Sequence, residues 1–330
     1  MLRKAHSLLL PMLVLAFAIP AAAADRLTGA TEPAELGPDF AVQGEYVGKV
    51  PTDEGEVKVG VQVIALGKGK FRAVGYHGGL PGDGWDQKEK HPVEGETVDG
   101  VVTFAADDGN WRATIKNGVL TVTDRQGKKI IAFKKVQRKS STLGAKPPAG
   151  AVVLFDGKSP DSFQGGRMTE DGLLMEGATS KQKFQSFTLH LEFRTPFKPE
   201  ARGQGRGNSG FYAQGRYEVQ ILDSFGLEGR NNECGGIYTI ADPKVNMCLP
   251  PLSWQTYDVD FTAAEYQDGK KVKDATMTVR HNGVVVHEKQ ALGHKTTAAP
   301  VNEGPEPGPI FLQNHGNPVR FRNIWVVKKK

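Results

Sequence analysis

Apolar and polar residues alternate in short segments along most of this chain. In residues 187–195 (FTLHLEFRT), four apolar side chains alternate with polar ones, which is the period of a β-strand with one buried face. No amphipathic helical pattern of any length interrupts these segments. The pattern therefore predicts strands at 57–66, 118–124, 128–136, 187–195, 254–261, 275–289, 309–316 and 319–327.

Turn residues are frequent between these segments, since the chain has 40 glycines and 20 prolines. The pair Asn282-Gly283 divides 275–289 into a hairpin, because both residues tolerate the positive φ angles of a type I′ turn. Many short strands separated by turns are typical of a sandwich or jelly roll. We therefore expect an all-β fold.

Composition changes along the chain and suggests two domains. Residues 40–138 are expected to form a small β-domain without an assigned role, and 151–330 a larger one. Between them, 139–150 (KSSTLGAKPPAG) has the Ser, Gly and Pro content of a linker. The glycine-rich segment 76–86 of the first domain is either a binding surface or an ordered surface loop, with His77, Asp83, Trp85 and Asp86 as its candidate side chains.

The first residues have the pattern of a secretory signal peptide. Arg3 and Lys4 precede an apolar run at 8–19, and small residues follow up to Ala24. A membrane anchor is the alternative, but the run is shorter than the ~20 residues of a span. We expect residues 1–24 to be removed, the protein to be exported to the periplasm or beyond the cell, and no membrane span to remain.

The charge of the chain argues against nucleic acid as a partner. Its formal net charge is +5. The expected cleavage removes two of these positive charges, Arg3 and Lys4. No dense basic patch interleaved with aromatic residues is present, so binding of nucleic acid is not expected.

The chain has two cysteines, Cys234 and Cys248. In an exported protein they meet an oxidising compartment, so we expect a disulfide between them. The alternative is a pair of metal ligands, but two thiolates without a nearby pair of histidines make a poor zinc site.

The segment 215–223 (GRYEVQILD) carries the strongest candidate chemistry. Glu218 and Gln220 share one face of a predicted strand, and a β-bulge at 221–222 would bring Asp223 to that face. Two carboxylates about two strand positions apart approach the ~5–5.5 Å of retaining glycosidases. Alternatively, Glu218 faces solvent and Asp223 caps the turn that follows.

Several separated motifs resemble the 3-keto-disaccharide hydrolase family, long listed as a domain of unknown function. These are GRGNSGFYAQGRYEVQILDSFG, NECGGIYTIADPKVNMCLPPLSWQTYDVDF, VRHNGVVVHE and GPIFLQNHGNPVRFRNIWV. The resemblance extends from residue 153 to residue 327 and leaves the first domain outside. It implies a concanavalin A-like jelly roll that acts on glycosides whose sugar carries a ketone at C3. The carbohydrate is then the expected partner.

The resemblance also implies a choice between two chemistries. EVQILD is similar to the E-x-D-x-x-E signature of laminarinase-type retaining hydrolases, but Gln220 and Asp223 replace the second and third acids. A 3-keto sugar instead permits removal of the C2 proton, elimination at C1 and addition of water. That route needs a base, an acid and a group that holds the enolate. The candidate catalytic residues are Glu218, Asp223 and His315, with Arg194, Arg216 or a divalent metal at the enolate.

Other polar and aromatic residues are candidates for holding the sugar, each with a plain structural role as the alternative. A metal bound by Glu218, Asp223 and His315 is possible but is not required by their spacing. The candidate substrate-binding residues are Glu192, Arg194, Asn208, Arg216, Gln220, Tyr238 and Gln313. Two further hypotheses remain at this point: a lectin without turnover and a structural envelope protein, since the fold does not determine the function.

Overall fold

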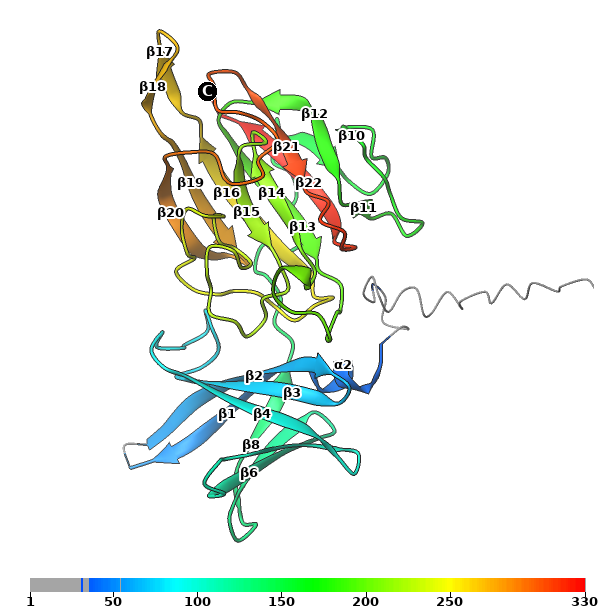
Figure 1. Ribbon diagram of the computed structural model, residues 1–330, viewed down its shortest axis with the longest axis vertical. Helices are drawn as coiled ribbons and strands as arrows, with labels where there is room; N and C mark the ends of the chain where they lie inside the picture. Colours follow the sequence, from blue (N-terminus) through cyan, green and yellow to red (C-terminus); the bar gives the residue numbers. More distant parts are fainter. Residues whose placement is uncertain (1–30, 32–35, 54, 330) are drawn as a thin grey trace, which may run out of the picture.

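The computed structural model describes residues 31, 36–53 and 55–329, which fold into two β-domains stacked end to end (Figure 1). The expected signal peptide at 1–24 lies outside the described residues, and so do residues 25–30 and 32–35. A short helix, α2 (Pro38–Val42), precedes the first strand, with a proline in its first turn. None of the helices in the described part of the chain is long and apolar enough to cross a membrane.

The first domain is a closed antiparallel barrel of eight strands. Neighbours in the sequence pair with one another, and β1 also pairs with β8, which closes the barrel. Tyr46, Val63, Phe71 and Phe104 fill its interior. The strands are β1 (Gly44–Thr52), β2 (Gly55–Gly67), β3 (Lys70–His77), β4 (Lys90–Val98), β5 (Val101–Ala105), β6 (Trp111–Lys116), β7 (Val119–Asp124) and β8 (Lys129–Val136).

The second domain is a sandwich of two sheets, as the alternation predicted. The five-stranded sheet has the order β10 (Phe163–Gln164), β12 (Ala178–Phe184), β21 (Gly308–Leu312), β14 (Ser209–Ala213) and β15 (Tyr217–Ile221). The seven-stranded sheet has the order β11 (Leu174–Met175), β22 (Arg320–Lys328), β13 (Phe187–Arg194), β16 (Gln255–Thr262), β19 (Ala275–His281) and β20 (Val284–Leu292), with β9 (Val152–Phe155) beside β22. A separate ribbon consists of β17 (Glu265–Gln267) and β18 (Lys270–Lys273).

The sandwich core follows from the period-two pattern of the strands. Leu189 and Leu191 of β13 face inward from one sheet, and Val219 and Ile221 of β15 face inward from the other. The residues between them on each strand therefore point to the outer face of their own sheet, the face turned away from the core. The only one of the eight predicted segments that clearly overruns its strand is 309–316, since β21 ends at Leu312.

The hairpin predicted at 275–289 is confirmed. β19 and β20 are joined at Asn282 and Gly283, whose φ angles are 53° and 84°. Positive φ at both positions is what a type I′ turn requires, and it suits the twist of the two strands.

The two domains share their hydrophobic cores. Ile64, Val74 and Tyr76 of the barrel belong to the core cluster of the sandwich. In the other direction, Phe197 of the sandwich belongs to the barrel cluster and packs edge-to-face on Phe40 with ring centroids 5.2 Å apart. Packing of this kind fixes the position of one domain relative to the other.

The segment expected as a linker lies along the outer face of the seven-stranded sheet. Thr142 Oγ1 donates to Asp258 Oδ2 at 2.6 Å, and the Gly144 N–H donates to Glu192 Oε1 at 2.6 Å. Asn323 Nδ2 donates to the carbonyl of Ala145, the next residue along the segment, at 3.0 Å. These bonds attach the connection to the sheet along its length.

Glu192 is central to this attachment. Its carboxylate is 1% exposed and receives bonds from Arg322 Nε at 2.7 Å and Asn323 Nδ2 at 2.9 Å. Burial raises the pKa of Glu192, but hydrogen bonds from His190, Asn323, Arg322 and Gly144 outweigh it and lower the pKa to about 2. The ionised carboxylate therefore stabilises the folded chain.

Glu192→Gln is expected to weaken stability only where the carboxylate is ionised. A pKa lowered from 4.5 to about 2 corresponds to about 3 kcal/mol, which is present above pH 4.5 and is lost as the pH falls towards 2. Chemical denaturation at pH 2, 4 and 7 measures this dependence. Glu288→Gln is the matched control, because Glu288 is an exposed glutamate with a side chain that is 67% accessible. An equal change in both variants at every pH would contradict the assignment.

Candidate active site

Four residues of two neighbouring strands lie together on the outer face of the five-stranded sheet. In the antiparallel pairing of β14 with β15, Tyr212 lies opposite Glu218 and Gly210 lies opposite Gln220. Their neighbours Phe211, Val219 and Ile221 belong to the core, so these four positions face away from it. All four are nevertheless buried, and the loop that carries Gln204 contacts Gln220.

Glu218 is the central ionisable group of this face. It is 3% exposed, and burial raises the pKa of its carboxyl to about 7, against a smaller lowering by the hydrogen bond with Tyr212. The Tyr212 hydroxyl also accepts a bond from Gln313 Nε2 at 3.0 Å. A chain of amide, phenol and carboxyl results. A carboxyl with a pKa near 7 can both take up and release a proton at neutral pH.

The space for this carboxyl exists because residue 210 is glycine. A Cβ at Gly210 would lie 2.3 Å from Glu218 Oε1 and 2.9 Å from Cε2 of Tyr212. The backbone of Gly210 is not in the positive-φ region, so the requirement is for room and not for conformational freedom.

A cluster of amides borders Glu218 on one side. Gln204, in the 3₁₀ turn η2 (Gly203–Gly205), accepts at its Oε1 from Gln220 Nε2 at 3.0 Å and from Asn208 Nδ2 at 2.8 Å. Asn208 Oδ1 and Gln313 Oε1 are buried and have no hydrogen-bond partner among the described residues. Amide oxygens in this state are ready acceptors for the hydroxyl groups of a ligand.

Gln204 was not among the residues expected from the sequence. The signal was the glycine-rich run RGQGRGNSG (202–210), in which a single glutamine stands between glycines. Periodicity could not point to it, because the turn η2 belongs to no strand.

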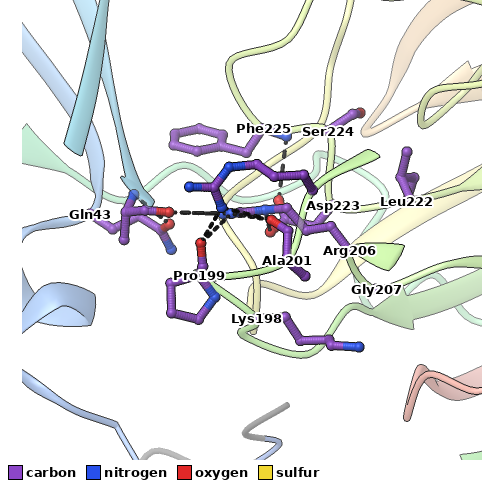
Figure 2. Close-up of polar contacts among 12 residues, drawn as sticks. Gln43, Lys198, Pro199, Ala201, Arg206, Gly207, Leu222, Asp223, Ser224 and Phe225 are labelled. Atoms are coloured by element: carbon purple, nitrogen blue, oxygen red, sulfur yellow. Dashed lines mark hydrogen bonds and ion pairs between the residues drawn. The ribbon is translucent and has the colours of Figure 1, made fainter. Parts of the chain in front are cut away.

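Asp223 does not join Glu218 in a carboxylate pair. β14 and β15 pair in continuous register up to Ser209 and Ile221, so the expected bulge does not form in the strand, and Asp223 lies beyond it. Its Oδ2 receives Arg206 Nε at 2.7 Å, and its Oδ1 the Phe225 N–H at 3.4 Å. Figure 2 shows Arg206 between Asp223 and the carbonyl of Pro199. The carboxylate thus serves a buried ion pair.

Glu192 and Arg194 lie on the opposite side of the sandwich. Both belong to β13 of the seven-stranded sheet, where Glu192 holds the connecting segment. The guanidinium of Arg194 lies 5.2 Å from the ring of Trp254, and that of Arg322 lies 3.9 Å from it. The structure therefore does not bring Glu192, Arg194 and Trp254 to the face that carries Glu218.

The remaining predicted residues surround the candidate site at different depths. Arg216 donates to the carbonyls of Asn302 and Glu306 at 2.8 and 3.0 Å and so holds the loop before β21. Tyr238 is half-buried, and its N–H donates to the carbonyl of Glu218 at 3.2 Å. His315 is exposed in the loop after β21, two residues beyond Gln313.

The expected disulfide is not formed. Cys234 and Cys248 are free thiols, 0% and 1% exposed. Cys234 Sγ lies 3.3 Å from the hydroxyl of Tyr257, and Cys248 Sγ lies 3.5 Å from the carbonyl of Leu222. The prediction rested on the compartment expected for the protein, whereas these contacts place both thiols in a polar network within the core.

Metal ligands are not gathered in the part of the chain that the structure describes. No group of three or more His, Cys, Asp or Glu side chains there is placed to hold a metal ion. In particular, Asp223 is engaged by Arg206, and His315 is an exposed loop residue. The proposed set of Glu218, Asp223 and His315 is therefore not assembled as a metal site.

Residues 150–327, which contain this whole face, match the family described as the 3-keto-alpha-glucoside-1,2-lyase-like domain. The chain belongs to this family. The match begins at the connection between the domains and ends in β22, so the barrel lies outside the 3-keto-alpha-glucoside-1,2-lyase-like domain. No curated protein matches the chain.

Two solved structures from Parabacteroides distasonis, both assigned provisionally as glycosyl hydrolases, are similar to this chain. The first has 34% identity and a TM-score of 0.50, and the match covers 55% of this chain and 85% of that one. The second has 19% identity and a TM-score of 0.40, with 55% and 95% covered. The family and the first of these structures support a role in acting on glycosides.

Gly210→Ala is expected to disrupt the site locally. The added methyl group would meet Glu218 Oε1 and displace it from Tyr212, so activity should fall by at least about 100-fold, as for a misplaced catalytic group. The free energy of unfolding should fall by about 1–3 kcal/mol, because overpacking is destabilising. Steady-state kinetics and thermal unfolding measure the two effects.

Gly205→Ala is the control for this substitution, since a Cβ at Gly205 meets nothing within 4 Å. Full activity in Gly210→Ala would show that the carboxyl of Glu218 does not need its present position.

Proposed function

We propose that this protein is an enzyme that cleaves 3-keto-glycosides, with Glu218 as the group that moves the proton. The observation that carries the proposal is a buried carboxyl with a pKa of about 7 on a polar sheet face within the family domain. Perturbed carboxyls in such surroundings are frequent at catalytic sites. The preference for a ketone at C3 is the finer part of the proposal and is supported by the family description.

The chemistry suits a site with one mobile proton. The ketone at C3 acidifies the hydrogen at C2. The carboxylate of Glu218 takes this proton, the C2–C1 double bond forms as the C1–O bond breaks, and the electron pair of that bond leaves with the aglycone oxygen. The aglycone oxygen takes up a proton, and Glu218 exchanges its proton with solvent. Water then adds to C1 and releases a proton to solvent while Glu218 delivers a solvent-derived proton to C2, so the net reaction is hydrolysis. One base serves both halves of the cycle.

The arrangement supports elimination more than double displacement. A retaining glycosidase of the ordinary kind needs a second carboxylate at about 5–5.5 Å. Asp223 is the second acid in the motif, and it is paired with Arg206. Among the two bases expected from the sequence, Glu218 is favoured over His315, because Glu218 is buried and hydrogen-bonded to Tyr212 while His315 is exposed.

Neighbouring residues would orient the sugar and the leaving group. The Tyr212 hydroxyl, bonded to Glu218 and Gln313, can donate to an oxygen as charge develops on it. The unpartnered amide oxygens of Asn208 and Gln313 would accept sugar hydroxyls. These contacts would be lost for a ligand that lacks the hydroxyls, which would give the site its selectivity.

The decisive experiment compares a 3-keto-disaccharide with its unoxidised parent, with and without a chelator, in deuterated water. Cleavage of the keto form alone, with deuterium at C2 of the product by mass spectrometry, is the expected result. Cleavage of the parent at a similar rate would indicate an ordinary glycosidase. Binding without cleavage of either sugar would indicate a lectin, and loss of cleavage under chelator would add a metal.

Glu218→Gln is expected to abolish turnover and to stabilise the protein at alkaline pH. The raised pKa means that the carboxylate form destabilises the fold: stability is full below pH 4.5, falls as the pH rises towards 7, and is lower by about 3 kcal/mol above it. Turnover by the wild type should fall as the pH drops below about 7, since the base is then protonated.

Calorimetry at pH 4 and pH 8 measures the change in stability, and most of the stabilisation should be absent at pH 4. Glu265→Gln, on the exposed ribbon β17–β18, is the control. Retained turnover in Glu218→Gln would remove this residue from the mechanism.

Export is a separate proposal, supported by the pattern of residues 1–24. N-terminal sequencing of the protein recovered from cell fractions tests it. A mature chain that begins near residue 25 outside the cytoplasm is the expected result, and an intact Met1 terminus in the cytoplasm would contradict it.

A further inference from the structure

A cavity lies between the two domains, and its lining does not include Glu218. It has a volume of about 760 Å³ and is formed by β3, β4 and the loop between them on the barrel side, and by residues 226–228 and Glu233 on the sandwich side. Small-molecule sites have volumes of roughly 300–1,000 Å³ and are frequent between domains. The barrel, which lies outside the matched family domain, supplies most of its lining.

The aromatic wall of this cleft is Trp85, from the glycine-rich segment 76–86. Its ring packs edge-to-face on the buried Tyr76, with centroids 5.2 Å apart and planes at 75°. Lys58 Nζ holds the same segment through Asp83 Oδ2 at 2.8 Å. Trp85 is thus fixed by the core below it and half-buried, with part of its surface lining the cleft.

The two walls of the cleft are held at a fixed separation. Lys90 Nζ, which lies 5.5 Å from the Trp85 ring centroid, donates to the carbonyl of Leu227 at 2.8 Å. A Cβ at Gly226 would lie 2.4 Å from Cδ1 of Ile64, so the backbone at this point is in direct contact with the barrel. A cleft that is formed in advance binds a ligand at a lower ordering cost for the protein.

Four of the charged side chains that line the cleft form two ion pairs, and the other two, Lys88 and Glu233, have opposite signs. Arg72 Nη2 contacts Glu94 Oε1 at 2.6 Å, and Lys90 Nζ contacts Glu228 Oε2 at 3.2 Å. A charged ligand would have to compete with these pairs, whereas a neutral ligand rich in hydroxyls can bond to both members of a pair. Such a ligand can also place its C–H face on an indole. This combination is typical of a sugar.

The sandwich wall of the cleft continues directly into the candidate active site. Residues 226–233 are followed by Gly235 and Gly236, whose backbones pair with Gln220 at 3.0 and 2.9 Å. The side chain of Gln204 also donates to the carbonyl of Asn232 at 2.8 Å. One segment therefore separates the cleft from the amide cluster beside Glu218.

We propose that this interdomain cleft is a second, non-catalytic binding site for a neutral carbohydrate chain, with Trp85 as the platform for a sugar ring. The barrel would then hold a sugar chain beside the site that cleaves glycosides. Binding at the cleft does not depend on the proposed reaction, because the cleft contains neither Glu218 nor Tyr212.

The test is isothermal titration of the full chain with maltotriose and cellotriose, with trigalacturonate as an anionic comparison. Saturable binding of a neutral trisaccharide is expected. Trp85→Ala should weaken it by at least about ten-fold, as expected for loss of an aromatic platform. Trp111→Ala, a half-buried tryptophan of the barrel that does not line the cleft, should leave the affinity unchanged.

A second substitution keeps the proposal testable if Trp85→Ala unfolds the barrel. Leu227→Trp should fill the cleft from the opposite wall and weaken binding without removing the platform. Glu218→Gln should bind the trisaccharide as tightly as the wild type, which separates this proposal from the proposed function. The absence of binding by both neutral sugars, binding of trigalacturonate alone, or unchanged binding in Trp85→Ala and Leu227→Trp would each overturn the proposal.

Discussion

The buried ion pair between Arg206 and Asp223 is the interaction on which the geometry of this protein depends. Arg206 precedes β14 and Asp223 follows β15, so the pair joins the ends of the two strands that carry the candidate site. Arg206 also donates to the carbonyls of Ala65, in the barrel, and Pro199. Since an unpaired buried charge is strongly destabilising, neither partner can be lost without disturbing both domains.

This arrangement explains how Glu218 can be buried as a carboxyl without an ion pair. The unfavourable desolvation of Glu218 is offset by the packing of its rigid surroundings. These are the core residues below β15, the ion pair at the strand end and the loops above. Tyr212 bonds to Glu218, and Gln313 bonds in turn to Tyr212, but neither supplies a positive charge. The two acids of the EVQILD motif thus have opposite environments, one paired with a guanidinium and one nearly alone. Burial raises the pKa of both carboxyls, but only at Asp223 does a guanidinium, that of Arg206, oppose this shift, so the two acids differ in role.

The fold was largely predictable from the sequence, and the site only in part. Alternation in 187–195 and the Asn282-Gly283 turn predicted β13 and a hairpin, because such patterns depend on local periodicity. Glu218 was predictable for the same reason, as a polar residue between core residues on one strand. Alternation also placed Glu192 on an outer face, but it could not tell which sheet the strand joined or that residues 140–145 would cover it.

Other features depended on tertiary contacts that no pattern encodes. The partner of Asp223 is 17 residues away in a loop, so spacing along the strand was misleading. Gln204 lies in a short turn and acquires its role only when Gln220 and Asn208 fold against it. The thiols of Cys234 and Cys248 were expected to be oxidised from the supposed compartment, whereas in the structure both are free, and Cys234 contacts the hydroxyl of Tyr257.

The shared core of the two domains constrains the residue at position 197. Phe197 packs into the barrel cluster, and Ile64 of the barrel packs into the sandwich cluster. A sandwich that exists alone would expose Phe197 to water, so it needs a polar residue or a covering loop at that position. Position 197 is therefore a place where a sandwich without the barrel is expected to differ from this chain.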